Sequence, residues 1–287
     1  MPELAEVAFF ARQWNAGMDA SVMRVTTHSS ARVFRESPAK RIASTLKGQA
    51  LTEILTAGKQ AAFRFSTDIW LGIHLGMSGR LFTDGSRENL APWAEGDKPP
   101  QPTHDRLVLH MSNGTALVFN DPRMFGLVRL YRGDTTPPWW AAIPPALSSP
   151  LFTLDVLKKV LDSHPGVLLK SLLLDQRYFP GIGNWMADEI MWRTRLSPHN
   201  RVRALGNKEV RLLYKTIREV CNDAMEVVSK SWYPAPDNWL FNHRWKRGGR
   251  CPRDGASLLY EQIGGRTACW CEKCQRQIKN YELKIKN

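Results

Sequence analysis

The chain has 287 residues, of which 43% are hydrophobic, and its 40 Lys and Arg against 27 Asp and Glu give a net charge of +13. This length and hydrophobic fraction suit a core-forming protein of about two domains and disfavour a disordered or fibrous one. No run approaches the ~18 apolar residues that cross a bilayer, and the first residues lack the basic and apolar regions of a secretory signal. We therefore expect neither a secreted nor a membrane-spanning protein.

The first part of the chain, residues 1–133, predicts a helix followed by short strands. Apolar residues spaced for one face of an opening helix are Leu4, Val7, Ala8, Ala11 and Trp14. Runs of strand length, separated by turns, are residues 51–57, 61–65, 69–74, 107–111 and 116–119. Short apolar runs between turns are typical of a β-sandwich or barrel, so we expect an antiparallel sandwich here.

The middle of the chain contains a Pro-rich segment, after which helical patterns follow. Residues 134–150 contain five Pro, too many for a regular helix or strand, and predict a linker. Helical spacing then returns at residues 153–161, 168–175, 185–195 and 207–229, with Thr153 and Asn207 as caps. We expect a helical domain over residues 151–240, which makes the whole an α+β protein of several domains.

The positive charge is concentrated in the C-terminal half. Residues 151–287 carry 24 of the 40 basic residues and 14 of the 27 acidic ones, which is +10 of the net +13. From residue 241 onward the basic residues are interspersed with Trp245, Tyr260, Trp270 and Tyr281. Positive charge with aromatic side chains suits a polyanion such as nucleic acid, although a basic surface also serves solubility alone.

Four of the five cysteines lie close together near the end of the chain: Cys251, Cys269, Cys271 and Cys274. In a reducing compartment such clustering favours a metal site over disulfides. We expect residues 241–287 to form a small metal-stabilised unit.

The start of the chain offers a nucleophile. Removal of Met1 would expose Pro2 as a secondary amine at the first position of the opening helix, where the helix dipole disfavours its protonated form. An unprotonated amine attacks a sugar C1′ and forms a Schiff base. Glu3 and Glu6 lie at the same helix end, where a carboxylate can move protons, although Pro and Glu are also ordinary first-turn residues.

Five segments, in order, resemble the formamidopyrimidine-DNA glycosylase and endonuclease VIII family of base-excision repair enzymes. They are Pro2-Glu-Leu-Ala-Glu-Val7, His74-Leu-Gly-Met-Ser-Gly79, Asn120-Asp-Pro-Arg-Met-Phe-Gly126, the stretch from Leu174 to Glu189 with its Gly-Ile-Gly-Asn turn, and the Cys-rich C-terminus. The resemblance covers nearly the whole chain. It implies an N-terminal helix and antiparallel β-sandwich, a helix-two-turns-helix domain and a zinc-finger-like β-hairpin.

The resemblance also implies roles for single residues. Pro2 would form the Schiff base, Glu3 would transfer protons and Lys59 would assist catalysis. The implied DNA-binding residues are His74, Met77, Arg123, Phe125, Asn184 and Arg266. A wedge of apolar side chains with an Arg suits a base-flipping enzyme, because the void left by an extruded nucleotide must be filled. Met77 and Phe125 also fit the alternative of core residues.

The chain departs from the family at three positions. Met124 replaces the family's second Arg, and Pro180 replaces a small residue at the Gly-Ile-Gly turn. In the finger, Cys251, Cys271 and Cys274 match the family's ligand spacing, while Asp254 occupies the second cysteine position.

Three thiolates and a carboxylate can make a tetrahedral zinc site. Since thiolate is the better zinc ligand, Cys269 or His243 are alternatives to Asp254 as the fourth ligand. A hairpin of the same shape without zinc is the remaining possibility. Arg266 would bind phosphate with or without the metal, because its guanidinium fork fits phosphate.

The resemblance implies a monomeric, cytoplasmic enzyme, associated with the nucleoid in a bacterium, that acts on double-stranded damaged DNA as glycosylase and abasic-site lyase. Met77, Arg123 and Phe125 favour the branch that removes oxidised purines such as 8-oxoguanine and formamidopyrimidines. The short stretch from residue 229 to 251 is closer to endonuclease VIII and favours oxidised pyrimidines. A catalytically silent DNA-binding protein is a third interpretation, against which Pro2, Glu3 and Lys59 argue together.

Overall fold

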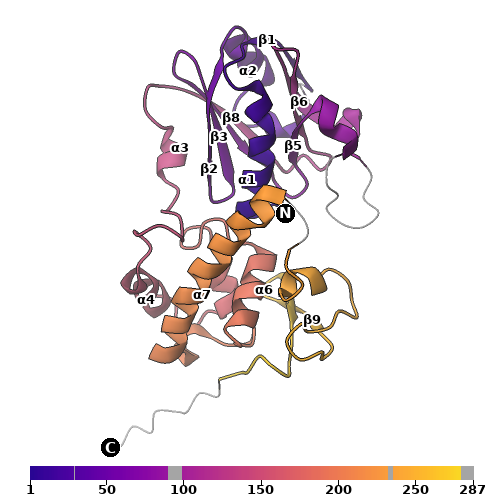
Figure 1. Cartoon of the computed structure of the whole chain (residues 1–287). Coiled ribbons are helices and arrows are strands. Elements are labelled where there is room, and N and C mark those ends of the chain that lie inside the picture. The colour runs from indigo at the N-terminus through magenta and orange to yellow at the C-terminus, as the bar shows by residue number, and fades with distance from the viewer. Residues whose placement is uncertain (29, 90–98, 232–234, 279–287) are drawn as a thin grey trace, which may run out of the picture. The chain divides into compact units, whose positions relative to one another are not determined.

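A computed structural model of the chain describes residues 1–28, 30–89, 99–231 and 235–278 (Figure 1). The chain divides into two compact units. Unit 1 comprises residues 1–143 with 225–233, and unit 2 comprises residues 144–224 with 234–287. Tyr281 and the rest of the expected finger region beyond residue 278 lie outside the described residues. Among the residues that the structure does describe, no helix is long and apolar enough to cross a membrane.

Unit 1 opens with helix α1 (Leu4–Arg12), which continues into the 3-10 helix η1 (Gln13–Gly17). The expected face is confirmed, since Val7, Ala8, Ala11 and Trp14 are buried. The expected start was wrong by two residues. Glu3 is the N-cap with extended backbone, so Pro2 precedes the helix instead of beginning it.

Two four-stranded antiparallel sheets form the expected sandwich (Figure 1). One sheet contains, in spatial order, β1 (Val22–Thr27), β6 (Asp105–Met111), β7 (Ala116–Asn120) and β5 (Arg80–Thr83). The other contains β2 (Leu51–Ala57), β3 (Gln60–Phe65), β4 (Ile69–His74) and β8 (Leu127–Arg132). Side chains from α1 and both sheets share one core, in which the rings of Trp14 and Phe63 lie 4.4 Å apart.

Shorter elements complete unit 1. They are η2 (Arg32–Phe34), α2 (Ala39–Leu46), η3 (Asp84–Asn89), η4 (Pro102–His104), α3 (Pro138–Ala141) and α8 (Val228–Ser231). Helix α3 falls in the expected linker, so the expectation that Pro would exclude regular structure there was wrong. Pro138 occupies the first helical position, where the missing N–H costs nothing.

Trp139 of α3 packs on the sheet at Gly72 of β4. A Cβ atom added to Gly72 would lie 2.4 Å from the Trp139 ring, and the Arg129 guanidinium lies 5.5 Å from that ring's centre. The first part of the linker is therefore held against unit 1, and only Gly allows this contact.

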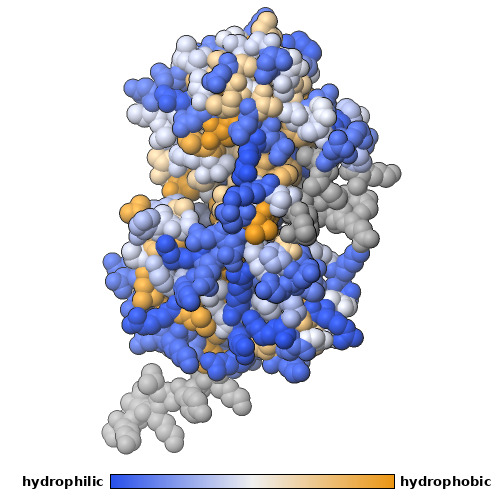
Figure 2. Space-filling model, in the orientation of Figure 1, coloured by the Kyte–Doolittle hydropathy of each residue, from blue (hydrophilic) through white to orange (hydrophobic). Residues whose placement is uncertain are grey.

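Unit 2 is helical and ends in a hairpin. Its elements are α4 (Leu154–Asp162), α5 (Leu169–Leu173), α6 (Asn184–Arg193), η5 (Val202–Ala204), most of α7 (Asn207–Glu226), η6 (Leu240–His243) and the strands β9 (Leu259–Ile263) and β10 (Arg266–Trp270). Thr153 caps α4 as expected, because its side chain accepts the Val156 N–H at 3.2 Å. Asn207 is the first residue of α7 and not its cap. The outward face along α7 is largely hydrophilic (Figure 2).

Candidate active site and DNA interface

Three residues around the start of α1 are buried although Met1 is exposed. Pro2 is buried, while Glu3 and Glu6 are 3% and 4% exposed. The Glu6 carboxylate accepts the backbone N–H of Glu3 at 3.1 Å, which is one half of a capping box. The Glu3 side chain accepts the backbone N–H of Glu6 in return, so both carboxylates take part in the cap at the helix end beside Pro2.

Lys59 lies in the two-residue turn between β2 and β3. Ala57 pairs with Gln60, and Gly58 adopts a positive φ of 54°, as a tight hairpin turn requires. Lys59 is only 7% exposed. Gln60 pairs in turn with His74 at the end of β4, so the turn and His74 share one end of the sheet.

His74 is a neutral side chain at neutral pH. Burial, and then the positive charges of Lys59, Arg129 and Arg35, lower the pKa of His74 to about 4. Its Nδ1 lies 3.1 Å from the Gly76 N–H and accepts it, which leaves the ring proton on Nε2. His74 can therefore donate one neutral hydrogen bond to a phosphate.

The three expected wedge residues lie in two loops. Met77 is 37% exposed and Phe125 is 43% exposed, so neither is a core residue. The Arg123 guanidinium lies 4.9 Å from the centre of the Phe125 ring. Met124 has a positive φ of 53° and packs against the core, so its replacement of the family's Arg leaves Arg123 and Phe125 at the surface.

Asp121 joins these two loops, a role that no pattern in the sequence indicated. Its carboxylate is fully buried and accepts the Ser78 hydroxyl at 3.0 Å and the Gly126 N–H at 2.8 Å. A Cβ atom added to Gly76 would lie 2.5 Å from the backbone of Phe125, so the loops touch. The loop carrying Met77 and the loop carrying Arg123 and Phe125 are thus held as one surface.

In unit 2 the Gly-Ile-Gly turn leads directly into α6. Gly181 has a φ of 91°, and the Gln176 side chain bonds Gly181 and Ile182 to hold the turn. Gly183 is the N-cap and Asn184 is the first helical residue. The Asn184 Nδ2 donates to the Thr267 carbonyl at 2.8 Å, and its second hydrogen can serve a phosphate at this helix start.

Arg266 is exposed at the first position of β10. It follows Gly264 and Gly265, whose φ values of 60° and 76° belong to the left-handed region. The glycines make the hairpin turn, and the Asn184 bond to Thr267 places this turn beside the start of α6.

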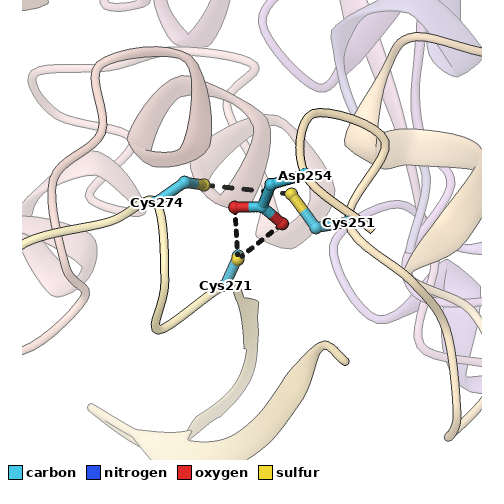
Figure 3. Close-up of side chains that lie close together, drawn as sticks. All are labelled: Cys251, Asp254, Cys271 and Cys274. Atoms are coloured by element: carbon cyan, nitrogen blue, oxygen red, sulfur yellow. Dashed lines mark hydrogen bonds between the residues drawn. The ribbon is translucent and has the colours of Figure 1, made fainter. Parts of the chain in front are cut away.

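The expected metal ligands come together (Figure 3). The ligand atoms of Cys251, Asp254, Cys271 and Cys274 all lie within 4.8 Å of one another. The sulfurs of Cys251 and Cys274 are 3.9 Å apart, and the Cys271 sulfur lies 3.6 Å from each Asp254 carboxylate oxygen. Three thiols and one carboxylate around one point match the donor set and size of a structural zinc site.

Hydrogen-bond donors surround this cluster, while burial raises the pKa values of Cys271 and Cys274, the latter to about 12. The Ala256 N–H donates to the Asp254 carboxylate at 3.0 Å and lowers the pKa of Asp254. Trp192 Nε1 donates to the Cys251 sulfur at 3.3 Å, and Arg253 donates to the Cys274 sulfur at 3.5 Å. Hydrogen bonds to sulfur stabilise the thiolates that a metal needs.

Neither alternative fourth ligand lies in the cluster that the described residues form. His243 bonds the Asp237 carbonyl at 2.8 Å. Cys269 lies instead beside Asp188, whose carboxylate accepts the Cys269 backbone N–H at 3.1 Å. Asp254 is the fourth donor that the geometry supplies.

Comparison with known families and proteins agrees over nearly the whole chain. Residues 1–128 match the formamidopyrimidine-DNA glycosylase N-terminal domain, and residues 144–233 match the formamidopyrimidine-DNA glycosylase H2TH domain. A formamidopyrimidine-DNA glycosylase of Thermus thermophilus is 32% identical over an alignment of 287 positions. The alignment covers 96% of this chain and 98% of that protein.

Solved structures show the same fold. The crystal structure of the MutM (Fpg) protein from Thermus thermophilus is 30% identical with a TM-score of 0.74, over 96% of this chain and 99% of that one. Lactococcus lactis Fpg, in a complex with DNA containing N7-benzyl-Fapy-dG, is 23% identical with a TM-score of 0.80, over 96% and 100% of the two chains. From this site geometry and these matches we conclude that the chain belongs to the formamidopyrimidine-DNA glycosylase family of DNA-repair enzymes.

Proposed function

We propose that this protein removes oxidised purines from double-stranded DNA and then cleaves the backbone at the abasic site, acting as a single chain. The observation that carries the proposal is the buried pair Pro2 and Glu3 at the start of α1, in a unit that also exposes Met77, Arg123 and Phe125. A protein that only bound DNA would need no imine-forming terminus.

The reaction begins once Met1 has been removed, because Pro2 then carries a secondary amine. Attack of this amine on C1′ forms a nitrogen–carbon bond and releases the damaged base. Glu3 transfers a proton to the sugar ring oxygen as the ring opens to the iminium. The iminium acidifies the adjacent carbon, so successive eliminations expel both flanking phosphates.

The wedge surface supports the flipping of the damaged nucleotide. Met77 and Phe125 are large apolar side chains that water already contacts, so inserting them between bases removes apolar area from water. Arg123 beside the Phe125 ring adds a donor for the base left unpaired. Lys59 and His74 would contact the phosphates of the flipped nucleotide, since both residues lie at one end of the same sheet.

The lesion preference rests on the wedge residues, which are those of the oxidised-purine branch. Solved complexes of Lactococcus lactis Fpg contain DNA with N7-benzyl-Fapy-dG in one case and with an oxidised pyrimidine in another. The fold alone therefore does not select the lesion class. The discriminating experiment is borohydride trapping on a panel of duplexes that each carry one lesion.

We expect trapping on 8-oxoguanine and formamidopyrimidine duplexes at least ~10 times faster than on duplexes with oxidised pyrimidines, because each contact that discriminates a base contributes about 1–3 kcal/mol. The reverse order would assign the endonuclease VIII-like activity. An absence of trapping on every lesion and on an abasic site would leave only a DNA-binding protein.

The finger would hold zinc through Cys251, Asp254, Cys271 and Cys274. Four protein donors close the coordination sphere, so the ion would be structural and supply no catalytic water. Its contribution is to order the segment that carries the hairpin, since metal binding and local folding are coupled.

Metal analysis of the purified protein is expected to find about one zinc per chain, and Cys271→Ser should release it because three ligands hold zinc much more weakly than four. DNA binding should weaken more than the stability of unit 1. Asp254→Cys should tighten the site, since thiolate is the softer donor. A zinc-free protein that binds DNA normally would instead establish a hairpin that needs no metal.

A further inference from the structure

The hairpin of β9 and β10 is attached to unit 2 at two places along β10. One is the ligand cluster, which Cys271 joins directly after the strand ends. The other is a group of buried charges that hydrogen-bonds to the backbone of Thr267 and Cys269, within the strand. Arg266 is next to this second attachment.

The buried charges are Lys170, Asp188 and Arg244, which are 0%, 2% and 8% exposed. Lys170 Nζ donates to one Asp188 carboxylate oxygen at 2.5 Å, and Arg244 donates to the other at 2.6 Å. Buried charges are costly unless each is paired and hydrogen-bonded. Here one carboxylate from α6 binds two cations, one from α5 and one from the segment after η6.

This network reaches the hairpin through backbone groups. Lys170 also donates to the Thr267 carbonyl at 2.9 Å, and the Cys269 N–H donates to Asp188 at 3.1 Å. The Thr267 carbonyl accepts Asn184 as well, at 2.8 Å. Because Arg266 precedes Thr267, its backbone position follows from these bonds.

The hairpin turn has a further contact on α5. A Cβ atom added to Gly264 would lie 2.0 Å from the Ser171 hydroxyl oxygen, so the turn lies directly on the residue after Lys170. Arg266 is therefore held on one side by the turn on α5 and on the other by Thr267. Neither contact involves a metal ligand.

We propose that Lys170 and Asp188 are positioning residues for Arg266: they hold the β9–β10 hairpin on α5 and α6 independently of the metal cluster. The inference rests on the DNA contact of Arg266 in the proposed function. It assigns a binding role to two buried residues that cannot themselves reach DNA from where they lie.

The test is Lys170→Met. The substitution removes one cation and leaves Asp188 paired with Arg244, so the buried pair is neutral and the fold should survive. Binding to a duplex with an uncleavable abasic analogue is expected to weaken about tenfold, the size of one charge-assisted contact, with zinc content unchanged. Lys215→Met on the exposed side of α7 removes the same charge and should leave the affinity unaltered.

A double-mutant cycle with Arg266→Ala separates positioning from other effects. Alone, Arg266→Ala should weaken DNA binding. The salt dependence of the binding constant should also fall, because about one counterion fewer is released from the DNA. If Lys170 acts through Arg266, adding Lys170→Met to Arg266→Ala should cause little further loss. Losses that multiply, or an unchanged affinity in Lys170→Met, would overturn the proposal.

Hydrogen exchange gives a readout that does not depend on DNA. In the zinc-loaded protein, Lys170→Met should speed exchange of the Cys269 amide and of the hairpin around it, while helix α7 stays protected. An unchanged exchange rate of the Cys269 amide would refute the claim that Lys170 holds the hairpin. Loss of zinc from Lys170→Met would refute the claim that this attachment is independent of the metal cluster. A wild-type protein that does not bind damaged duplexes would refute the proposed function and leave the exchange test intact.

Discussion

An N-terminal extension that keeps Met1 in peptide linkage is expected to abolish borohydride trapping, with a loss of at least ~100-fold on an 8-oxoguanine or abasic duplex, because an amide nitrogen is not a nucleophile. Pro2→Gly should also reduce trapping sharply, since the primary amine of Gly lacks the pyrrolidine ring that fixes the orientation of the nitrogen lone pair. The measurement is the yield of covalent protein–DNA adduct on a denaturing gel.

Binding to an uncleavable abasic analogue supplies the control. It should be nearly unchanged in both variants, because Pro2 precedes α1 and the Glu3 cap remains. Undiminished trapping in the extended protein would remove Pro2 from the mechanism and point to an internal amine such as Lys59.

Glu3→Gln is expected to abolish release of the damaged base, by ~100-fold or more, because a positioned proton-transfer group contributes about that factor. Cleavage of a preformed abasic site should persist in part, since that substrate no longer needs the first step. Comparing strand cleavage on the lesion duplex and on the abasic duplex measures the two steps separately.

The substitution is nearly isosteric, which suits a residue that is 3% exposed and caps α1. Glu53→Gln on strand β2 is the matched control and should leave both steps unchanged. Equal loss of both steps in Glu3→Gln, together with a lower melting temperature, would assign Glu3 a structural role.

Local patterns predicted the regular elements well. Strands β2 and β4 have the expected bounds, and the helices from α4 to α7 lie within a few residues of their expected positions. Besides the short helix α3, the described residues contain β1, β5, β8 and α2, which were not predicted. The sequences of β1, β5, β8 and α2 contain basic residues, several of them at exposed or half-buried positions. Their apolar pattern is interrupted, and for the strands backbone pairing with neighbouring strands decides the conformation.

The start of α1 contains a local signal that outweighs the preference of Pro for a first helical position. Glu3 and Glu6 have the three-residue spacing of a capping box, and the structure uses it to begin the helix after Glu3. The prediction instead put Pro2 in the first helical position, on its general preference for that site. The capping box outweighs that preference because the Glu3 side chain accepts a backbone N–H at the helix start, whereas the Pro2 ring has no acceptor atom.

The family could be identified, and most residues of the candidate site predicted, from the chain alone, because the short motifs around Pro2, His74, Arg123 and Asn184 are continuous in sequence. The ligand spacing likewise showed that Asp254 stands where the family has a cysteine. Tertiary structure was needed to establish that Asp254 joins the three cysteines while Cys269 and His243 do not. It was also needed for contacts between distant residues, such as Ser78 with Asp121 and Asp188 with Cys269. Such partners leave no periodic signal in the chain, because their meeting depends on how whole elements pack.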